Sequence, residues 1–329
     1  KRMLEFYKKI RDLVRSYQPD ATVYLDGEMY SKTNTLDRRK SFAKNEREGM
    51  LEVGIDVDQL KKIPGITYLP RYRFNRAKSY SRATDQEYML SLLEPDHIAL
   101  GKSASGRVFK ISNGYFEPHS AVPVTKLGLT KSKKYSFFAS AQAAGRNMLE
   151  KLAIPLAEQD ISLFIEGGAQ YMFLQDDICR EWLTAYKQLP ALPFERSKTM
   201  SDPVALWSRT CDDGFYFYLV NRENYPVKCF VTFKNCKELT KLASKDIIKL
   251  NDGRLQITLQ PFGLQSYKAV DRTKIVETDA VIPADKLKLL ESQIAFCDKL
   301  AKTLNNLPES ERNAFLIRLN KSKKSFALK

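Results

Sequence analysis

Hydrophobic positions in the first half of the chain follow helical and strand periods in turn. Leu4, Tyr7, Ile10, Leu13 and Val14 have the spacing of one helix face, which predicts an amphipathic helix over residues 1–17. Apolar and β-branched runs predict strands at residues 22–29, 66–71, 108–112 and 161–165. Helical stretches are predicted between and after them, at residues 41–51, 87–93, 134–154 and 176–188. Strands that alternate with helices predict parallel βαβ units and an α/β fold.

Two local signals refine this pattern. Residues 54–60, with Pro64 and Gly65, are predicted to form a turn, and Pro155 is predicted to end the long helix before it.

The pattern changes after residue 196. Short alternating runs with turn residues between them predict strands at residues 205–209, 215–221, 228–233, 246–250, 255–259 and 265–269. Several short strands with regular punctuation are typical of an antiparallel β-sandwich. Helical spacing returns after Pro283, and a last helix at residues 310–321 is predicted to fray into a basic tail. The predicted domains are therefore residues 1–196, 197–272 and 273–329.

Composition places the chain among ordinary globular proteins, with 43% hydrophobic and 28% charged residues. No apolar run reaches the roughly 18 residues of a membrane span, and the first residues lack the apolar block of a secretory signal. They begin within a helical pattern that has no cap, so we expect that something upstream has been lost. Five cysteines without a CxxC pair favour reduced thiols over a zinc site, although a Cys229–Cys236 pair stays open.

The net charge of +15 raises the question of a polyanionic partner. The lysines are spread over predicted helices and turns, which favours a solvated basic surface over a polyanion-binding face. The most basic run, Lys321–Lys324, lies near the C-terminus.

Acidic, aromatic and basic residues recur where the predicted parallel strands end. They are Asp26 and Glu28, Arg71 and Tyr72, Tyr115, Glu117 and His119, and Glu166. In (β/α)8 barrels the active site is built at the carboxyl ends of the strands. Paired carboxylates flanked by aromatic rings are the groups that cleave glycosidic bonds, and a nearby arginine keeps a nucleophilic carboxylate ionised.

Each of these residues also has a structural interpretation. Glu117 could form a surface salt bridge, and Asp26 and Glu28 could cap a loop or pair with Arg38 and Arg39. His119 could be a hydrogen-bonding loop residue, and Glu166 could precede a tight glycine turn. Trp182 and Trp207 are predicted to be core residues.

Five segments carry a resemblance to a known family: GITYLPRYRF, NGYFE, LAEQDISLFIEGGAQ, FYFYLVNRENYPVKCFVTF and LQPFGLQSYK. The chain resembles the C-terminal half of bacterial (β/α)8-barrel glycoside hydrolases with an appended β-sandwich, in the clan of β-galactosidases and β-mannosidases. The resemblance implies a partial TIM barrel of about four βα units, a β-sandwich and C-terminal helices.

The resemblance also implies roles for individual residues. Glu117 stands where the clan places its nucleophile, at the end of the seventh strand. The clan's acid/base, usually Asn-Glu after strand four, has no counterpart after a strand here, since Asn45-Glu46 lies in a predicted helix. If the first strand is strand five, the acid/base lies upstream of this chain; if it is strand four, Glu28 is the candidate.

The sequence therefore predicts a glycoside hydrolase with Glu117 and Glu28 as catalytic candidates and Asp26, Arg71, Tyr72, Tyr115, His119 and Glu166 lining the substrate site. No metal or organic cofactor is expected. The expected partner is a carbohydrate, and no membrane partner is expected. Nucleic acid is disfavoured as a partner, and a homo-oligomer stays open. The sequence does not indicate the compartment. The competing hypothesis is a non-catalytic protein that binds an acidic polysaccharide or nucleic acid through its basic surface.

Overall fold

A computed structural model describes most of the chain. The described residues are 2–26, 46–69, 71–73, 99–103, 106–112, 122–123, 136–137, 145–167, 176–270, 272–304 and 309–327.

The N-terminal helix packs on a parallel strand pair. Helix α1 (Arg2–Tyr17) buries Tyr7 in a core that includes Leu25 of β1 (Val23–Asp26) and Ile66 of β2 (Ile66–Leu69). The two strands are parallel, with Val23 opposite Ile66 and Asp26 opposite Leu69. The predicted helix over residues 1–17 is therefore confirmed.

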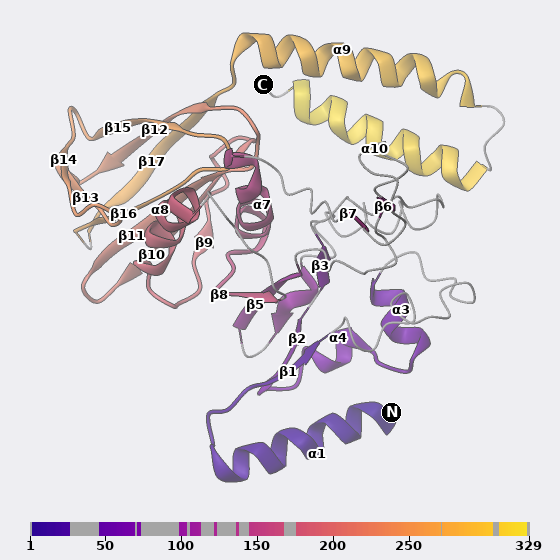
Figure 1. Cartoon of the computed structure of the whole chain (residues 1–329). Coiled ribbons are helices and arrows are strands. Elements are labelled where there is room, and N and C mark those ends of the chain that lie inside the picture. Colours follow the sequence, from indigo (N-terminus) through magenta and orange to yellow (C-terminus); the bar gives the residue numbers. More distant parts are fainter. Residues whose placement is uncertain are drawn as a thin grey trace.

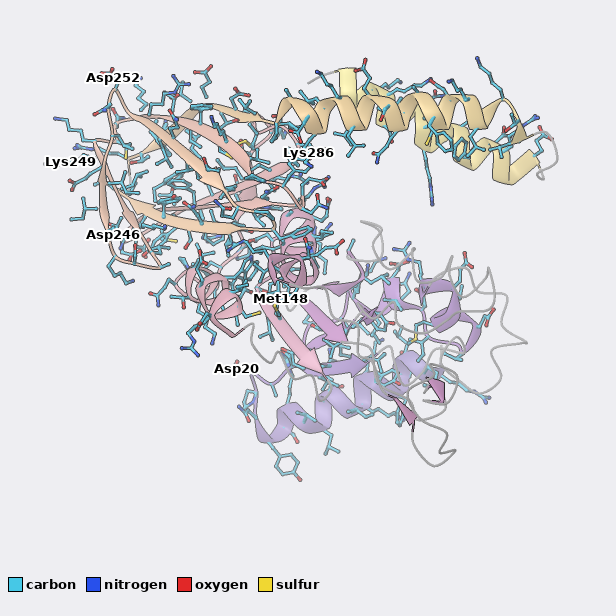
Figure 2. The ribbon with its side chains drawn as sticks, turned by 45° about the horizontal axis from the view of Figure 1, so that its top comes forward. Asp20, Met148, Asp246, Lys249, Asp252 and Lys286 are labelled. Carbon is cyan, nitrogen blue, oxygen red and sulfur yellow. The ribbon has the colours of Figure 1, made fainter. Side chains whose placement is uncertain are left out.

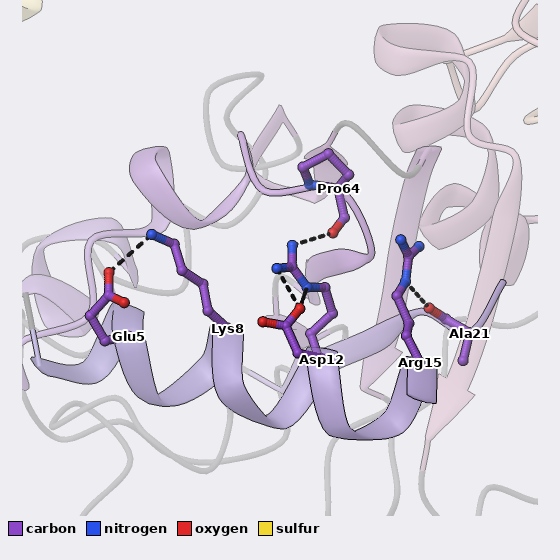
Figure 3. Close-up of polar contacts among 7 residues, drawn as sticks. Glu5, Lys8, Asp12, Arg15, Ala21 and Pro64 are labelled. Carbon is purple, nitrogen blue, oxygen red and sulfur yellow. Dashed lines mark hydrogen bonds and ion pairs between the residues drawn. The ribbon is translucent and has the colours of Figure 1, made fainter. Parts of the chain in front are cut away.

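Polar contacts hold α1 against the segments that precede β1 and β2 (Figure 3). Arg11 donates to the carbonyl of Pro64 at 3.0 Å, and Arg15 donates to the carbonyl of Ala21 at 3.0 Å. A glycine is required at residue 65, since its φ is +79° and a Cβ there would lie 2.5 Å from the Arg15 guanidinium.

The described part of the connection between β1 and β2 contains α3 (Glu46–Glu52) and α4 (Val57–Leu60). The prediction of a turn over residues 54–60 was wrong for the second part of that range. Asp56 caps α4 by accepting from the backbone of Gln59 at 3.1 Å, which lets one helical turn form before Pro64.

The parallel arrangement continues through three further strands. Strand β3 (Arg71–Arg73), which follows β2 after Pro70, pairs with β5 (Gly106–Ser112), and β5 pairs with β8 (Leu163–Gly167), in both cases in parallel. The strands lie side by side in the lower half of Figure 1. The predicted parallel pairing is confirmed for all three strand pairs, β1–β2, β3–β5 and β5–β8.

Smaller elements accompany these strands. They are η3 (Ala99–Gly101), β4 (Lys102–Ser103), which is antiparallel to β5, and the antiparallel pair β6 (Val122–Pro123) and β7 (Ser136–Phe137).

The long helix predicted over residues 134–154 was wrong. Ser136 and Phe137 form β7, a 3₁₀ helix η6 covers Gly145–Leu149, and α7 runs from Glu150 to Gln159 with Pro155 inside it. Proline lacks the N–H for one helical hydrogen bond, which costs roughly 3 kcal/mol in a helix interior. Leu152 and Leu156, on either side of Pro155, are buried in a core, and this tertiary burial outweighs the local preference.

Residues 195–281 form two antiparallel sheets, here called the two-sheet unit. The six-stranded sheet has the order β14-β13-β16-β11-β10-β9, and the three-stranded sheet has the order β15-β12-β17. In chain order the strands are β9 (Glu195–Arg196), β10 (Val204–Cys211), β11 (Gly214–Asn221), β12 (Val227–Lys234), β13 (Glu238–Lys241), β14 (Ile247–Lys249), β15 (Arg254–Leu259), β16 (Leu264–Ala269) and β17 (Lys274–Val281).

Strands β13 and β17 were not predicted. Strand β17 pairs with β12 and extends the sheet beyond residue 272, where the sequence suggested a boundary.

The central strand β11 is buried along its whole length because both of its faces are covered. Phe217 and Leu219 face the three-stranded sheet, in a core with Val231. Tyr218 and Val220 face helices α7 and α8 (Asp176–Lys187) on the other side. A strand buried on both faces reads as a continuous apolar run, as in FYFYLV.

The helices of the first half therefore share a core with the two-sheet unit. Figure 2 shows Met148 between that unit and the parallel strands, and its sulfur lies 3.8 Å from that of Cys179 in α8. Trp182 is 2% exposed and donates to the carbonyl of Phe262 at 3.1 Å, while Trp207 is 6% exposed. Both tryptophans are core residues, as predicted.

The chain ends in a helical hairpin of α9 (Ala284–Ala301) and α10 (Glu309–Ala327), which extends from the two-sheet unit in Figure 2. Lys323 of α10 pairs with Asp298 of α9 at 2.5 Å. The predicted end at residue 321 was wrong, because the helix continues through the basic run. Lysine is a good helix former and is favourable near a helix C-terminus.

Two further observations concern the whole described part. None of its helices has both the length and the apolar character needed to cross a membrane. All five cysteines are free thiols.

Candidate functional site

The carboxyl ends of the parallel strands form one edge of the first half of the molecule. Arg73, the last residue of β3, is the register partner of Ser112, the last residue of β5, and Ser112 is the partner of Gly167, the last residue of β8. Asp26 ends β1 beside Leu69 at the end of β2. Strands β3, β5 and β8 therefore terminate level with one another, while β1 and β2 end level with each other, four residues before Arg73. We take these strand ends as the candidate site and call them the strand-end edge.

Three predicted site residues lie close together on the backbone at this edge. Tyr72 and Glu166 are both register partners of Ile111, so the two lie on either side of β5. Their Cα atoms are about 10 Å apart, two interstrand spacings of roughly 4.8 Å. Arg71 is one residue before Tyr72 and is level with Lys110 of β5.

Asp26 is the last residue of β1, on the far side of β2 from β5. Its register partner Leu69 lies four residues before Arg73, so Asp26 ends short of the level at which β3, β5 and β8 terminate. The other predicted site residues, Glu28, Tyr115, Glu117 and His119, lie outside the described residues.

The opposite end of β8 is fixed by a buried carboxylate, Asp160, that the sequence interpretation missed. Asp160 ends α7 in the left-handed conformation, at φ +45°, and is 5% exposed. It accepts from the Tyr218 hydroxyl of β11 at 2.7 Å and from the Phe194 backbone N–H at 2.7 Å. A single acid three residues before β8 ties α7 to the six-stranded sheet.

Tyr186 of α8 completes this network. Its hydroxyl donates to the carbonyl of Ile161 at 2.8 Å, directly after Asp160. Burial, and then the neighbouring Asp160 carboxylate, raise the pKa of Tyr186 above its ordinary value, so the hydroxyl stays protonated and remains a donor. In barrels this end of the strands serves stability rather than chemistry.

An ion cluster binds α7 to the strands of the two-sheet unit. Glu158 of α7 pairs with Arg222 at the end of β11, and with Arg196 of β9 at 3.9 Å. Arg222 also lies 3.7 Å from Asp202. The carboxylate of Glu158 is mostly shielded from solvent and has two cationic partners, so the cluster orients α7 rather than forming a reactive centre.

No local signal in the sequence could have identified Asp160 as a buried anchor, since its partner Tyr218 is 58 residues away. The only hint is that aspartate tolerates the left-handed conformation at a helix end better than most residues do.

The described residues offer no metal centre: within those ranges, no three His, Cys, Asp or Glu side chains gather closely enough to hold an ion. The chemistry available at the strand-end edge is that of carboxylate, guanidinium and phenol groups.

Comparison with known proteins gives no family assignment from sequence. No family model matches the chain, and no curated protein matches it.

The solved structures to which the chain is similar include glycoside hydrolases. α-Galactosidase I from Mortierella vinacea is 13% identical with a TM-score of 0.28, over 38% of this chain and 36% of that one. An α-amylase from Anoxybacillus is 20% identical with a TM-score of 0.29, over 39% and 34%. An endoxylanase from Clostridium papyrosolvens is 12% identical with a TM-score of 0.30, over 56% and 53%. The chain thus spans between a third and about half of these proteins, and likenesses this weak do not assign it to a family.

Proposed function

We propose that this chain is the C-terminal half of a (β/α)8-barrel glycoside hydrolase with an appended β-sandwich, and that it takes part in hydrolysis of an O-glycosidic bond. The observation that carries the proposal is the parallel order of β1, β2–β3, β5 and β8. In each parallel pair a strand lies beside one that follows it later in the chain, and acidic, aromatic or basic residues occur where these strands end. This is the arrangement that builds an active site in a barrel.

Exposure along α1 and β1 supports an arc that continues into further strands. Within the described residues β1 pairs with β2 alone, and Tyr24 of β1 is 42% exposed. On the flank of α1, Phe6 is 52% exposed, Leu13 62% and Tyr17 86%. Parallel sheets normally have both faces covered, and proteins usually protect exposed sheet edges. A preceding half-barrel would cover both features.

In the proposed reaction Glu117 is the nucleophile. The sequence places it five residues after Ser112, the last residue of β5. Its carboxylate would attack the anomeric carbon while an acid/base carboxyl protonates the leaving oxygen, and water would then release the sugar in the reverse sense. The acid/base is supplied upstream or by Glu28, two residues after the end of β1.

The remaining residues would bind the sugar. Arg71 and His119 supply hydrogen-bond donors, and the arginine keeps a nearby carboxylate ionised. Tyr72 and Tyr115 supply aromatic faces for the apolar side of a pyranose ring. Asp26 and Glu166 supply acceptors for its hydroxyl groups.

The test is hydrolysis of a panel of aryl glycosides by this chain and by the chain extended upstream. Turnover by this chain that is lost in both Glu117→Gln and Glu28→Gln would support Glu28 as the acid/base. Turnover by the extended polypeptide only, again dependent on Glu117, would support an upstream acid/base. Loss of activity with Glu117→Gly that sodium azide restores, with formation of a glycosyl azide, would identify the nucleophile. Turnover by neither polypeptide would refute the proposal.

A further inference from the structure

The outer face of the three-stranded sheet is unlike the other sheet faces of the two-sheet unit. The six-stranded sheet is covered on both sides, by α7 and α8 and by the second sheet. Strand β12 alternates between buried residues that face the core and Lys228, Phe230, Thr232 and Lys234 on the other side. The two lysines are exposed, so this face meets solvent where they lie.

Like charges face each other at one end of this surface. Lys234 of β12 is the direct register partner of Lys274 of β17, and both side chains are exposed. In the part of the chain that the structure describes, neither lysine forms a salt bridge. Like charges directly opposite each other on neighbouring strands destabilise a sheet. Such a pair is expected where an anion is bound.

A third cation lies further along the same face. Arg254 of β15 is the register partner of Thr232, which lies two residues before Lys234 on the same face of β12. Its guanidinium lies 4.6 Å from the centre of the Phe230 ring. An arginine stacked on an aromatic ring has lost part of its freedom and presents its planar donors outward, which suits bidentate binding of a carboxylate or sulfate.

The face also carries two carboxylates, so charge alone does not define it. Glu277 is opposite Thr232, and Asp279 is opposite Phe230. Asp279 accepts from the backbone of Ala280 at 2.8 Å. Both lie on β17, along the sheet from the Lys234–Lys274 pair. The lysine pair lies at the end of the strands near the turn that contains Asp252, which Figure 2 labels, and the Arg254 guanidinium lies further along the face, over Phe230 and level with Asp279.

We propose that this basic sheet face, formed by Lys234, Arg254 and Lys274, binds an acidic polysaccharide through its carboxylate or sulfate groups. A polysaccharide is favoured over single-stranded nucleic acid because Phe230 is half-buried and its ring is covered by Arg254. Proteins that bind single strands use free aromatic rings on which bases stack. Binding at this face is independent of hydrolysis and goes beyond the proposed catalytic function.

The test measures binding of sodium polygalacturonate to the full chain at two salt concentrations. Lys234→Gln with Lys274→Gln is compared with Lys288→Gln with Lys302→Gln, a matched pair of exposed lysines on the α9–α10 hairpin that removes the same charge. We expect the sheet-face variant to bind about five- to twentyfold more weakly than the parent, with a smaller salt dependence. The hairpin variant is expected to bind within about twofold of the parent.

A second readout separates a binding role from a structural one. Because the lysines repel each other, Lys274→Gln alone should leave the melting temperature unchanged or raise it by about 1–2 °C while weakening binding. Equal loss of binding in the two double variants would show attraction by net charge only and would overturn the proposal. No binding, equal binding of neutral dextran, or tighter binding of oligothymidylate of equal charge would overturn it as well.

Discussion

Asp160→Ala removes the carboxylate that anchors the start of β8, and its cost can be worked from the contacts. The Tyr218 hydroxyl and the Phe194 N–H each lose an acceptor, in a place where Tyr218 is 1% and Phe194 4% exposed. A buried donor left without a partner costs about 1–3 kcal/mol. The left-handed conformation at φ +45° costs alanine about 1 kcal/mol more than aspartate. The loss in unfolding free energy should be about 3–7 kcal/mol.

Two matched variants distinguish the carboxylate from its surroundings. Asp160→Asn keeps one acceptor oxygen and the tolerance for positive φ, so it should cost about 1–2 kcal/mol. Tyr218→Phe removes the donor instead of the acceptor and leaves no unsatisfied hydroxyl. The loss of unfolding free energy in the double variant Asp160→Ala, Tyr218→Phe should be smaller than the sum of the losses in the two single variants, because both remove the same hydrogen bond.

The assay is urea unfolding followed by circular dichroism. The order of stability should be parent, Asp160→Asn, Asp160→Ala, with unchanged slopes against denaturant. If Asp160→Ala costs less than about 1 kcal/mol, the carboxylate does not anchor α7 to the sheet and the reasoning is refuted.

Three further predictions concern other parts of the molecule. Burial, and then the nearby Asp279 carboxylate, raise the pKa of the Cys229 thiol to about 12. An aromatic disulfide reagent at pH 8 should therefore modify the half-exposed Cys211 and Cys297 first. Equal modification of Cys229, measured by mass spectrometry, would contradict this. Hydrogen bonds from Lys268 and Tyr216 lower the pKa of Asp213, so its contribution to stability is present at neutral pH and is lost as the pH falls through the lowered folded-state pKa. The melting temperature of Asp213→Asn should therefore lie below that of the parent at pH 7 and converge with it in acid, and parallel curves would argue against the effect. Leu319 of α10 is 7% exposed, and Leu319→Ala should lower the local unfolding free energy of the hairpin by about 2–3 kcal/mol. Amide hydrogen exchange should then be faster in α9 and α10 and unchanged in the sheets. Faster exchange throughout the protein would show that the hairpin is not a separate unit.

Much of the fold follows from local pattern. Helix α1 and strands β10, β11, β12, β15 and β16 were predicted because their apolar spacing is set by burial and their ends by turn residues. Strand β17 was missed because it is exposed on an edge and a register shift opposite Thr232 and Phe233 breaks its alternation. Strand β13 has only four residues and no clear alternation.

The candidate site was predictable only as a set of strand ends. Asp26, Arg71, Tyr72 and Glu166 occur at or near the ends of parallel strands because a strand's end is marked locally in the sequence. The packing of α7 and α8 on the six-stranded sheet, and the burial of Asp160, depend on contacts between distant segments, which periodicity does not encode.

The most direct test of the proposed glycosidase is trapping of its covalent intermediate. An extended polypeptide containing this chain is incubated with 2-deoxy-2-fluoro glycosides that carry a good leaving group, and its peptides are analysed by mass spectrometry. The account predicts one added sugar on the peptide that contains Glu117, and none in Glu117→Gln. A sugar attached to another carboxylate, or turnover of aryl glycosides that persists in Glu117→Gln, would contradict it.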